Sequence, residues 1–174
     1  MSARPVNDLE QELAAEIPAL RRFATTLTRH TANADDLVQT TLEKAIVAWA
    51  RRDEDRDIRT WLFSILYRQF VDNQRRSSRH RRLLQWFLPS DEPATGSLEQ
   101  QYEVRSALGV FDRLPESQRT VLLLIAVEGM RYKEVGAALG IPVGTVMSRV
   151  SRARQTYRQL MEKPQRARHL KVMK

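Results

Sequence analysis

The chain has 174 residues, no cysteine and a formal net charge of +8 at pH 7. This length allows one ordinary domain or two small ones, and the lack of cysteine excludes disulfides, thiolate metal sites and thiol redox sensing. The positive charge favours a polyanionic partner but does not by itself identify one.

In the N-terminal half, up to about residue 82, apolar residues recur at helical intervals without strand-like alternation, which predicts three packed helices. The first 16 residues are too acidic for a signal peptide, and the longest apolar run, 121–127, is too short to span a membrane. We therefore expect a cytoplasmic protein. Pro18 is expected in the first turn of the first helix. Asn33 is expected to cap the second helix, 34–49, with Asp35 and Asp36 at the positive end of its dipole.

The third predicted helix, 57–76, is apolar around most of its circumference, which is typical of a central core helix. One polar stripe, bordered by Trp61 and Ile65, is expected to face solvent or a ligand. Its members are Ser64, Arg68, Asp72 and Arg75. A basic run over 75–82 fits either a solvated helix end or a single-strand site that combines phosphate attraction with base stacking, and the residues alone leave both open.

Residues 83–98 break the helical pattern and predict a linker. Trp86 and Phe87 are expected to pack back on one domain's edge, and the acidic pair Asp91 and Glu92 lies between two basic segments. A second helical part follows, with a helical stretch in 102–113 and a buried helix, 115–127, that turns at 128–129. The basic residues 163–174, with Pro164 as a helix breaker, predict a frayed tail.

Residues 132–154, YKEVGAALGIPVGTVMSRVSRAR, predict a helix-turn-helix. Gly140 is expected to end its first helix in the left-handed conformation, and Pro142 suits the start of the next helix. One side of the second helix is apolar and expected to be buried: Val146, Val150, Ala153, Tyr157 and Leu160. The other side is polar: Thr145, Ser148, Arg152 and Gln155. An ordinary helical hairpin with a solvated basic face is the alternative for this segment.

The residues suggest no catalytic site, no metal and no cofactor. His30, His80 and His169 lack partners at metal-ligand spacing, and the adjacent Asp35 and Asp36 diverge by about 100° on a helix. There is neither a Gly-rich phosphate loop nor a nucleophile elbow. We therefore do not expect an enzyme.

Four segments in this order closely resemble bacterial sigma factors of the extracytoplasmic function group, over about residues 18–162. They are ADDLVQTTLEKA, DIRTWLFSILYRQFVDNQRR, a short linker, and LPESQRTVLLLIAVEGMRYKEVGAALGIPVGTVMSRVSRAR. The resemblance implies an all-α fold of two small helical domains. A region 2 three-helix bundle, 1–82, would be joined by the linker 83–98 to a region 4 helix-turn-helix domain, 99–162, followed by the tail 163–174. It also implies a subunit that binds core RNA polymerase, directs it to promoters and helps to melt them.

The resemblance further implies three sets of site residues. The contacts to the polymerase clamp would be Asp36, Leu37, Gln39, Thr40 and Glu43. The contacts to the minus-10 element would be Arg59, Trp61, Ser64, Arg68, Asp72, Arg75 and Arg76. The contacts to the minus-35 element would be Gly144, Thr145, Ser148, Arg149 and Arg152. Many relatives carry Asn at the position of Arg68; arginine has no acceptor atom, so the base preference of those relatives is not transferred to this chain.

The partners implied are core RNA polymerase, through its clamp and flap, promoter DNA and an anti-sigma protein. In the family the linker runs through the polymerase, where Asp91 and Glu92 would suit a segment that RNA displaces. A plain helix-turn-helix activator is one alternative, although it would need only the second half of the chain. A sigma mimic that sequesters a regulator is another, although it would need no DNA-reading arginines. A DNA-processing enzyme would lack catalytic groups.

Overall fold

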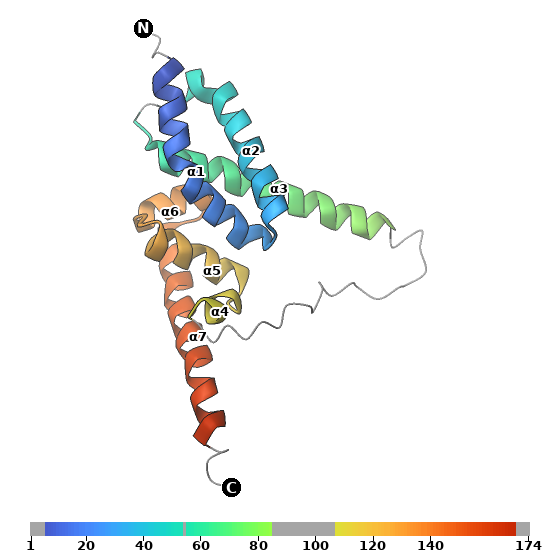
Figure 1. Ribbon diagram of the computed structural model, residues 1–174, viewed down its shortest axis with the longest axis vertical. Coiled ribbons are helices and arrows are strands. Elements are labelled where there is room, and N and C mark those ends of the chain that lie inside the picture. The colour runs from blue at the N-terminus through green and yellow to red at the C-terminus, as the bar shows by residue number, and fades with distance from the viewer. Residues whose placement is uncertain (1–5, 54, 85–106, 170–174) are drawn as a thin grey trace.

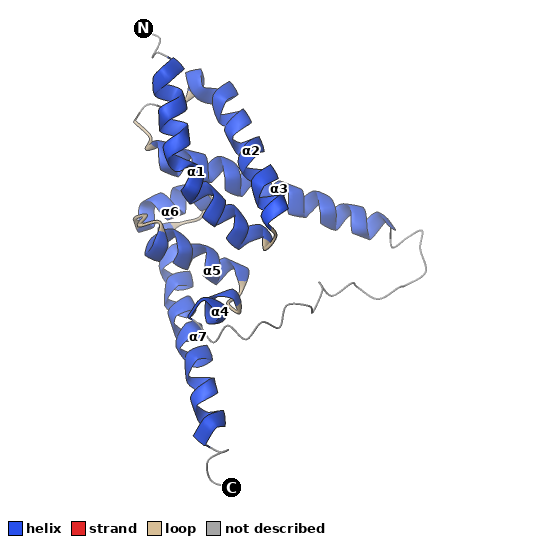
Figure 2. Ribbon diagram, viewed as in Figure 1, coloured by secondary structure: helices blue, strands red, loops and turns tan. Residues whose placement is uncertain are grey.

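The computed structural model describes residues 6–53, 55–84 and 107–169, and every regular element within them is a helix (Figure 2). This confirms the all-α prediction. The helices form two groups that pack against each other at the centre, while the C-terminal parts of α3 and α7 project away in different directions (Figure 1). The residues predicted to form most of the linker, with Trp86, Phe87, Asp91 and Glu92, lie outside the described ranges.

The first group contains α1 (Val6–Thr28), α2 (Thr31–Ala48) and α3 (Ile58–Leu84), with a short 3-10 turn, η1 (Trp49–Arg51), after α2. Phe23 of α1 and Phe63 of α3 are fully buried, and their rings stack with centroids 5.0 Å apart. Asp57 caps α3, because its Oδ2 accepts a hydrogen bond of 2.8 Å from the backbone N–H of Thr60. Leu62, Phe63 and Leu66 of α3 are also buried, so α3 is the core helix that the sequence predicts.

The link between the first two helices is shorter than predicted. Arg29 takes a left-handed conformation with φ of 60°, and α2 already begins at Thr31 after the extended residue His30. Asn33 therefore lies within the first turn rather than at the cap, and the predicted cap is wrong. Asp35 and Asp36 fall beyond the first turn, so the predicted dipole interaction is also wrong; Asp35 instead accepts a 3.0 Å hydrogen bond from Arg21 Nε.

Two prolines lie inside helices. Pro18 was predicted in a first turn, but α1 begins 12 residues earlier at Val6. Pro164 was predicted to end the last helix, but α7 continues through it to His169. A proline removes one N–H donor from a helix, and the good helix formers around both positions outweigh that local cost. The structure thus extends helix into two predicted irregular segments, and α3 likewise includes Leu83 and Leu84 of the predicted linker.

The second group contains α4 (Ala107–Asp112), α5 (Glu116–Leu122), α6 (Tyr132–Leu139) and α7 (Val143–His169). The helix predicted over 115–127 changes character midway, since α5 continues into a π-helical turn, η2 (Leu123–Val127). The chain then reverses at Gly129, whose φ is 67°. Val121, Leu124, Val135 and Val146 are fully buried and form the centre of this group.

The two groups share one continuous apolar core. Helix α3 packs against α6, and α1 packs against α5, so the second group lies on the N-terminal half of α3 in Figure 1. Among the described helices, none is both long and apolar enough to cross a membrane. This close packing brings residues of the first and second halves of the chain into one interface.

Candidate functional site

The segment α6–turn–α7 has the geometry of a helix-turn-helix, as predicted. Gly140 ends α6 with φ of 66°, and the backbone N–H of Ile141 donates to the carbonyl of Gly136 at 3.0 Å. A Cβ atom at Gly136 would lie 3.0 Å from the carbonyl oxygen of Ile141, so the turn is packed tightly on α6. Val146, Val150 and Ala153 anchor α7 in the core. The opposite face of α7 is therefore fixed in orientation.

The five predicted minus-35 residues lie together on the first two to three turns of α7. Ser148 and Arg152 are exposed, whereas Thr145 and Arg149 are half-buried at the helix flank. The Ser148 hydroxyl donates to the Thr145 carbonyl at 3.0 Å. At Gly144 a Cβ would meet no described atom within 4 Å, so the opening turn is accessible from outside. The positive end of the α7 dipole and its first N–H groups are thus open to an anion.

Two apolar side chains on the same part of α7 were missed in the sequence. Met147 is 55% exposed and Val143 is 38% exposed. A signal was available for Met147, which lies about 100° from Val146 and off the buried stripe. Val143 continues that stripe seven residues before Val150, so helical periodicity predicts it as buried and gives no signal for its exposure. They extend the outward surface of α7 with apolar contacts.

Four of the predicted minus-10 residues form an exposed surface on the C-terminal half of α3. They are Arg68, Asp72, Arg75 and Arg76. Trp61 lies on the same side of the helix, about seven residues earlier, and is half-buried. Its ring is 6.1 Å from that of Trp49, and the guanidinium of Arg52 lies 4.6 Å from the Trp49 ring centroid and 6.0 Å from that of Trp61. This end of the surface is therefore an aromatic cluster that carries a cation.

The other two predicted minus-10 residues do not join this surface. Ser64 is 1% exposed, and its hydroxyl donates to the carbonyl of Trp61 at 2.6 Å. The expectation that Ser64 faces solvent is wrong, because a serine whose hydroxyl is satisfied by its own helix can be buried. Arg59 lies about 180° around α3 from Arg68 and points toward the second group of helices.

Arg59 belongs to an ion-pair cluster that the sequence did not reveal. The Glu128 carboxylate, 0% exposed, accepts two hydrogen bonds from Arg22, at 2.8 Å from Nε and 2.9 Å from Nη2, and another from Arg59. Arg59 Nε lies 3.7 Å from Glu16 Oε2, and burial raises the pKa of the Glu16 carboxyl above its usual value. The hydrogen bonds that Arg22 donates to Glu128 raise the pKa of the Arg22 guanidinium. No local sequence signal could have found this cluster, because Glu128 is 106 residues from Arg22 and 69 from Arg59.

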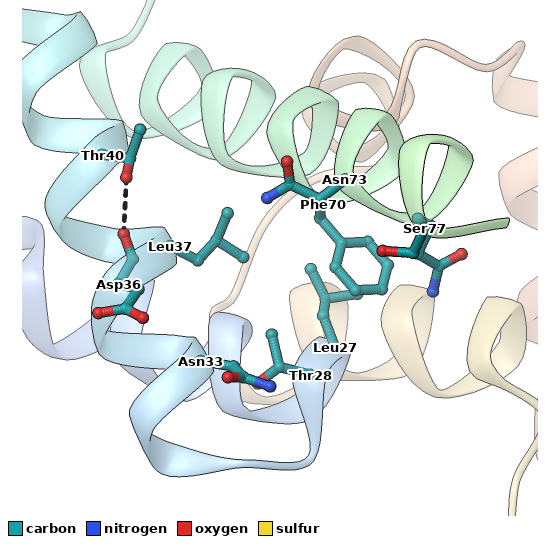
Figure 3. A pocket seen from close by; sticks show the side chains of 10 residues that line it. Leu27, Thr28, Asn33, Asp36, Leu37, Thr40, Phe70, Asn73 and Ser77 are labelled. Atoms are coloured by element: carbon teal, nitrogen blue, oxygen red, sulfur yellow. Dashed lines mark hydrogen bonds between the residues drawn. The ribbon is translucent and has the colours of Figure 1, made fainter. Parts of the chain in front are cut away.

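The predicted polymerase-binding residues lie along α2. Asp36, Gln39, Thr40 and Glu43 are exposed, with Gln39 Nε2 donating to Glu43 Oε1 at 3.1 Å. The Thr40 hydroxyl donates to the Asp36 carbonyl at 2.8 Å, as drawn in Figure 3. Leu37 is only 5% exposed and packs into the core, so it supports this surface from beneath.

A pocket of about 560 Å³ opens beside these residues, between α1, α2 and α3 (Figure 3). Asp36, Leu37 and Thr40 line its α2 side. Sequence reasoning missed the α3 side, which consists of Phe70, Asn73, Gln74 and Ser77. Asn73 and Ser77 lie one helical turn apart, but residues 72–82 of this helix are almost all polar or charged, so their spacing does not single them out.

The described residues contain no group of three or more His, Cys, Asp or Glu side chains placed to hold a metal ion. His30 is exposed at the start of α2, and the side chains of His80 and His169 lie outside the described set. The surfaces above offer charged, hydrogen-bonding and apolar side chains.

Two family models match the chain, the Sigma2 domain of PhyR over residues 13–67 and region 4 of Sigma-70 over residues 106–156. The ECF RNA polymerase sigma factor EcfG of Rhodopseudomonas palustris is 36% identical, over 86% of this chain and 83% of that protein. The chain belongs to the ECF RNA polymerase sigma factors. The first match falls within α1–α3 and the second overlaps α4–α7, and these two helical groups are called region 2 and region 4 below.

Solved structures agree with this family. The sigma factor RpoE of Bartonella quintana, in complex with the anti-sigma factor NepR, is 30% identical with a TM-score of 0.72, over 89% of this chain and 97% of that one. The anti-anti-sigma factor PhyR, also from a complex with NepR of Bartonella quintana, is 19% identical with a TM-score of 0.56, over 87% of this chain and 49% of that one. The second likeness concerns the fold alone.

Proposed function

We propose that this sigma factor reads the minus-35 element with α7 and the minus-10 element with α3 while it holds core RNA polymerase through α2. The observation that carries the proposal is the outward face of α7, where Ser148 and Arg152 are exposed on a helix locked by its buried opposite face. A helix presented in this way fits the major groove.

At the minus-35 element, the open first turn at Gly144 and Thr145 would bind a phosphate. Ser148, Arg149 and Arg152 would then reach base edges, and an arginine that contacts guanine through two hydrogen bonds discriminates by about 1–3 kcal/mol. Exposed Met147 adds an apolar contact suited to a thymine methyl group. The phosphate contact at the first turn would position α7 on the DNA, and the side chains that reach the base edges would recognise the base sequence.

At the minus-10 element, Arg68, Arg75 and Arg76 would attract the phosphates of a strand that separates from its duplex. Trp61 and its aromatic neighbour Trp49 would offer stacking at the other end of this surface. Unstacking a base costs a few kcal/mol, and such contacts offset that cost. Ser64 is left out of this surface because it is buried, and Arg59 because it faces region 4.

The polymerase contact would use the polar face of α2, with Asp36, Gln39, Thr40 and Glu43, and the pocket beside it. Region 4 would contact the flap. A protein that binds polymerase and promoter DNA would act in the cytoplasm. The structure of RpoE with NepR supports an anti-sigma partner for this chain as well. The predicted domain limits were 1–82, 83–98, 99–162 and 163–174. Because α3 ends at Leu84 and α7 ends at His169, we propose 1–84 for region 2, 85–98 for the linker, 99–169 for region 4 and 170–174 for the tail.

Protection of promoter DNA, measured with and without core polymerase, tests this function. We expect the chain to protect both elements only with polymerase present, and Arg152→Ala to remove protection at minus-35 first. Tight protection of duplex promoter DNA by the chain alone, unchanged when polymerase is added, would indicate a plain activator instead.

A sigma mimic is the second candidate, and one observation favours it. The region 2 model that matches is that of PhyR, and its match ends at Tyr67, before the exposed arginines of α3. Those arginines and the polar face of α7 would have no purpose in a protein that binds only a regulator. A mimic would bind an anti-sigma protein but give no polymerase-dependent protection.

A further inference from the structure

We propose that Glu128, Arg22 and Arg59 form a clasp that holds regions 2 and 4 closed on each other, and that this clasp must open before both promoter elements can be read. The inference rests on the proposed function. It concerns a contact between the two regions that includes Arg59, which was predicted for the minus-10 surface but bonds to Glu128 instead.

The clasp is built across the interface and not within either region. Glu128 comes from region 4, while Arg22 lies on α1 and Arg59 on α3. The described hydrogen bonds of the Glu128 side chain all run to these two arginines. Among the described residues, region 4 therefore supplies no hydrogen bond to this carboxylate, although the Glu128 side chain is 0% exposed.

The backbone places Glu128 at this interface through two departures from regular helix. The π-helical turn η2 ends with the N–H of Glu128 bonded to the Leu123 carbonyl at 3.0 Å. Gly129 follows in the left-handed conformation, and the N–H of Met130 bonds to the Leu124 carbonyl at 2.9 Å. Single π-helical turns inside helices frequently mark functional positions. Here the widened turn places Glu128 between the two arginines.

Other polar contacts between the two regions are weaker. Arg56 Nη2 reaches the Ala137 carbonyl at 3.4 Å, Arg29 Nη2 reaches the Asp112 carbonyl at 3.3 Å, and Gln74 Nε2 reaches Glu116 Oε2 at 3.3 Å. All three are exposed and longer than the 2.8–2.9 Å bonds of the paired Arg22 and Glu128. Bidentate pairs between an arginine and a carboxylate are among the strongest protein hydrogen bonds. Of the polar contacts described between the two regions, the clasp therefore has the shortest hydrogen bonds and the only buried carboxylate.

Closure conflicts with reading two elements on one duplex. The minus-10 and minus-35 elements lie about 25 base pairs apart, or about 85 Å at roughly 3.4 Å per pair. In the closed structure α6, which adjoins the minus-35 helix α7, packs directly on α3. The part of α3 from Arg59 to Arg76 is only about 25 Å long, which is much shorter than the separation of the two elements. The 22 residues 85–106 can span up to about 75 Å, so the chain is long enough for the regions to separate.

Removing one partner of the clasp should favour the open state. Glu128→Gln keeps the shape of the side chain but removes the anion that Arg22 and Arg59 share across the interface, and leaves only Glu16 of region 2, 3.7 Å from Arg59 Nε. Arg22 and Arg59 are 50% and 31% exposed, so both can regain water when the regions part. Loss of either arginine instead leaves Glu128 buried with one cation fewer, which also disfavours closure.

Distances between spin labels on the full chain test the clasp. Because the chain has no cysteine, Val47→Cys on α2 and Ser151→Cys on α7 create the only two labelling sites, and both positions are exposed. We expect one short distance distribution in the parent. Glu128→Gln and Arg22→Gln should each raise the ratio of long to short distances by about tenfold or more.

Matched controls are available beside the clasp. Glu134→Gln removes a carboxylate that pairs with Arg131 inside region 4, and Arg21→Gln removes an arginine that pairs with Asp35 inside region 2. Neither should alter the distances. If circular dichroism shows that Glu128→Gln does not fold, the label distances of Arg22→Gln test the clasp, because Arg22 is half-exposed and its loss should be tolerated. Distributions for Arg22→Gln and Glu128→Gln that match those of the controls would overturn the clasp.

A transcription assay on the same variants separates this inference from the function on which it rests. Open distances in the clasp variants without any transcript would support the clasp as a closing contact and refute the sigma function. Normal transcription with unchanged distances would refute the clasp and leave the function standing. If both proposals hold, adding core polymerase and promoter DNA should shift the parent to long distances.

Discussion

The Gln69 side-chain amide donates a hydrogen bond of 3.1 Å to the Thr41 hydroxyl, and both residues are buried. The Thr41 hydroxyl in turn donates to the carbonyl of Leu37 at 2.7 Å. This chain joins α2, which carries the proposed polymerase contact, to α3, which carries the proposed minus-10 contact. The two surfaces are therefore held in a fixed relation by a buried polar link.

Thr41→Val should destabilise the chain by about 1–3 kcal/mol, because the Gln69 amide would lose its acceptor inside the core. The free energy of unfolding, measured in urea, checks this value. Thr40→Val is the control, since Thr40 is exposed and bonds only its own helix. A loss for Thr41→Val no larger than for Thr40→Val would contradict a structural role of the link.

Two glycines of the helix-turn-helix should respond differently to alanine. Gly140→Ala should cost about 1–2 kcal/mol of stability, because an L-residue is strained at φ of 66°. Gly144→Ala meets no described neighbour and should leave stability within about 0.5 kcal/mol, yet it should weaken minus-35 binding by crowding the phosphate. Thermal unfolding and promoter protection measure the two effects separately. Equal loss of stability in both variants would refute this division.

Arg149→Ala should weaken promoter use selectively at minus-35 positions, by about 1–3 kcal/mol for the base that Arg149 contacts. Arg158→Ala, farther along α7, should weaken binding uniformly or not at all. Transcription from templates with single minus-35 substitutions distinguishes these outcomes. The assignment fails if Arg149→Ala causes the same loss on scrambled minus-35 sequences.

The pH dependence of stability should report Glu134. Its carboxylate accepts hydrogen bonds from the backbone N–H and Nε of Arg131, at 2.7 and 2.6 Å, and the side-chain bond is the main reason that its pKa lies below the usual 4.5. A depressed folded-state pKa contributes stability that is present above pH 4.5 and is lost as pH falls through the folded-state value. Urea unfolding at a series of acidic pH values should therefore show a shallower decline for Glu134→Gln than for the parent. Parallel curves would exclude this contribution.

The helix-turn-helix was predictable because local signals agree there. Gly140 is needed where φ is positive, and the spacing of Val146, Val150 and Ala153 identifies the buried face of α7. Helical periodicity also gave the exposed residues Arg68 and Asp72. These features depend on residues a few positions apart in the chain, so the spacing of residue types in the sequence predicts them.

Other features depend on contacts that periodicity does not encode. Ser64 lies at a polar position of the stripe, yet its own helix satisfies its hydroxyl and permits burial. Pro18 marks a helix start in many sequences, but here the helix forms on both sides of it. Glu128 finds its partners only after two distant parts of the chain pack together. Of these positions, Glu128 alone is explained here by contacts between distant parts of the chain.

Transcription in vitro by core polymerase with this chain, on matched templates with the minus-10 or the minus-35 element scrambled, tests the central claim most directly. We predict transcripts from the intact promoter, a strong loss when either element is scrambled, and none from core polymerase alone. No transcript from any template in a promoter library, or transcripts that ignore both elements, would contradict the assignment of α3 and α7 as the two promoter-reading helices.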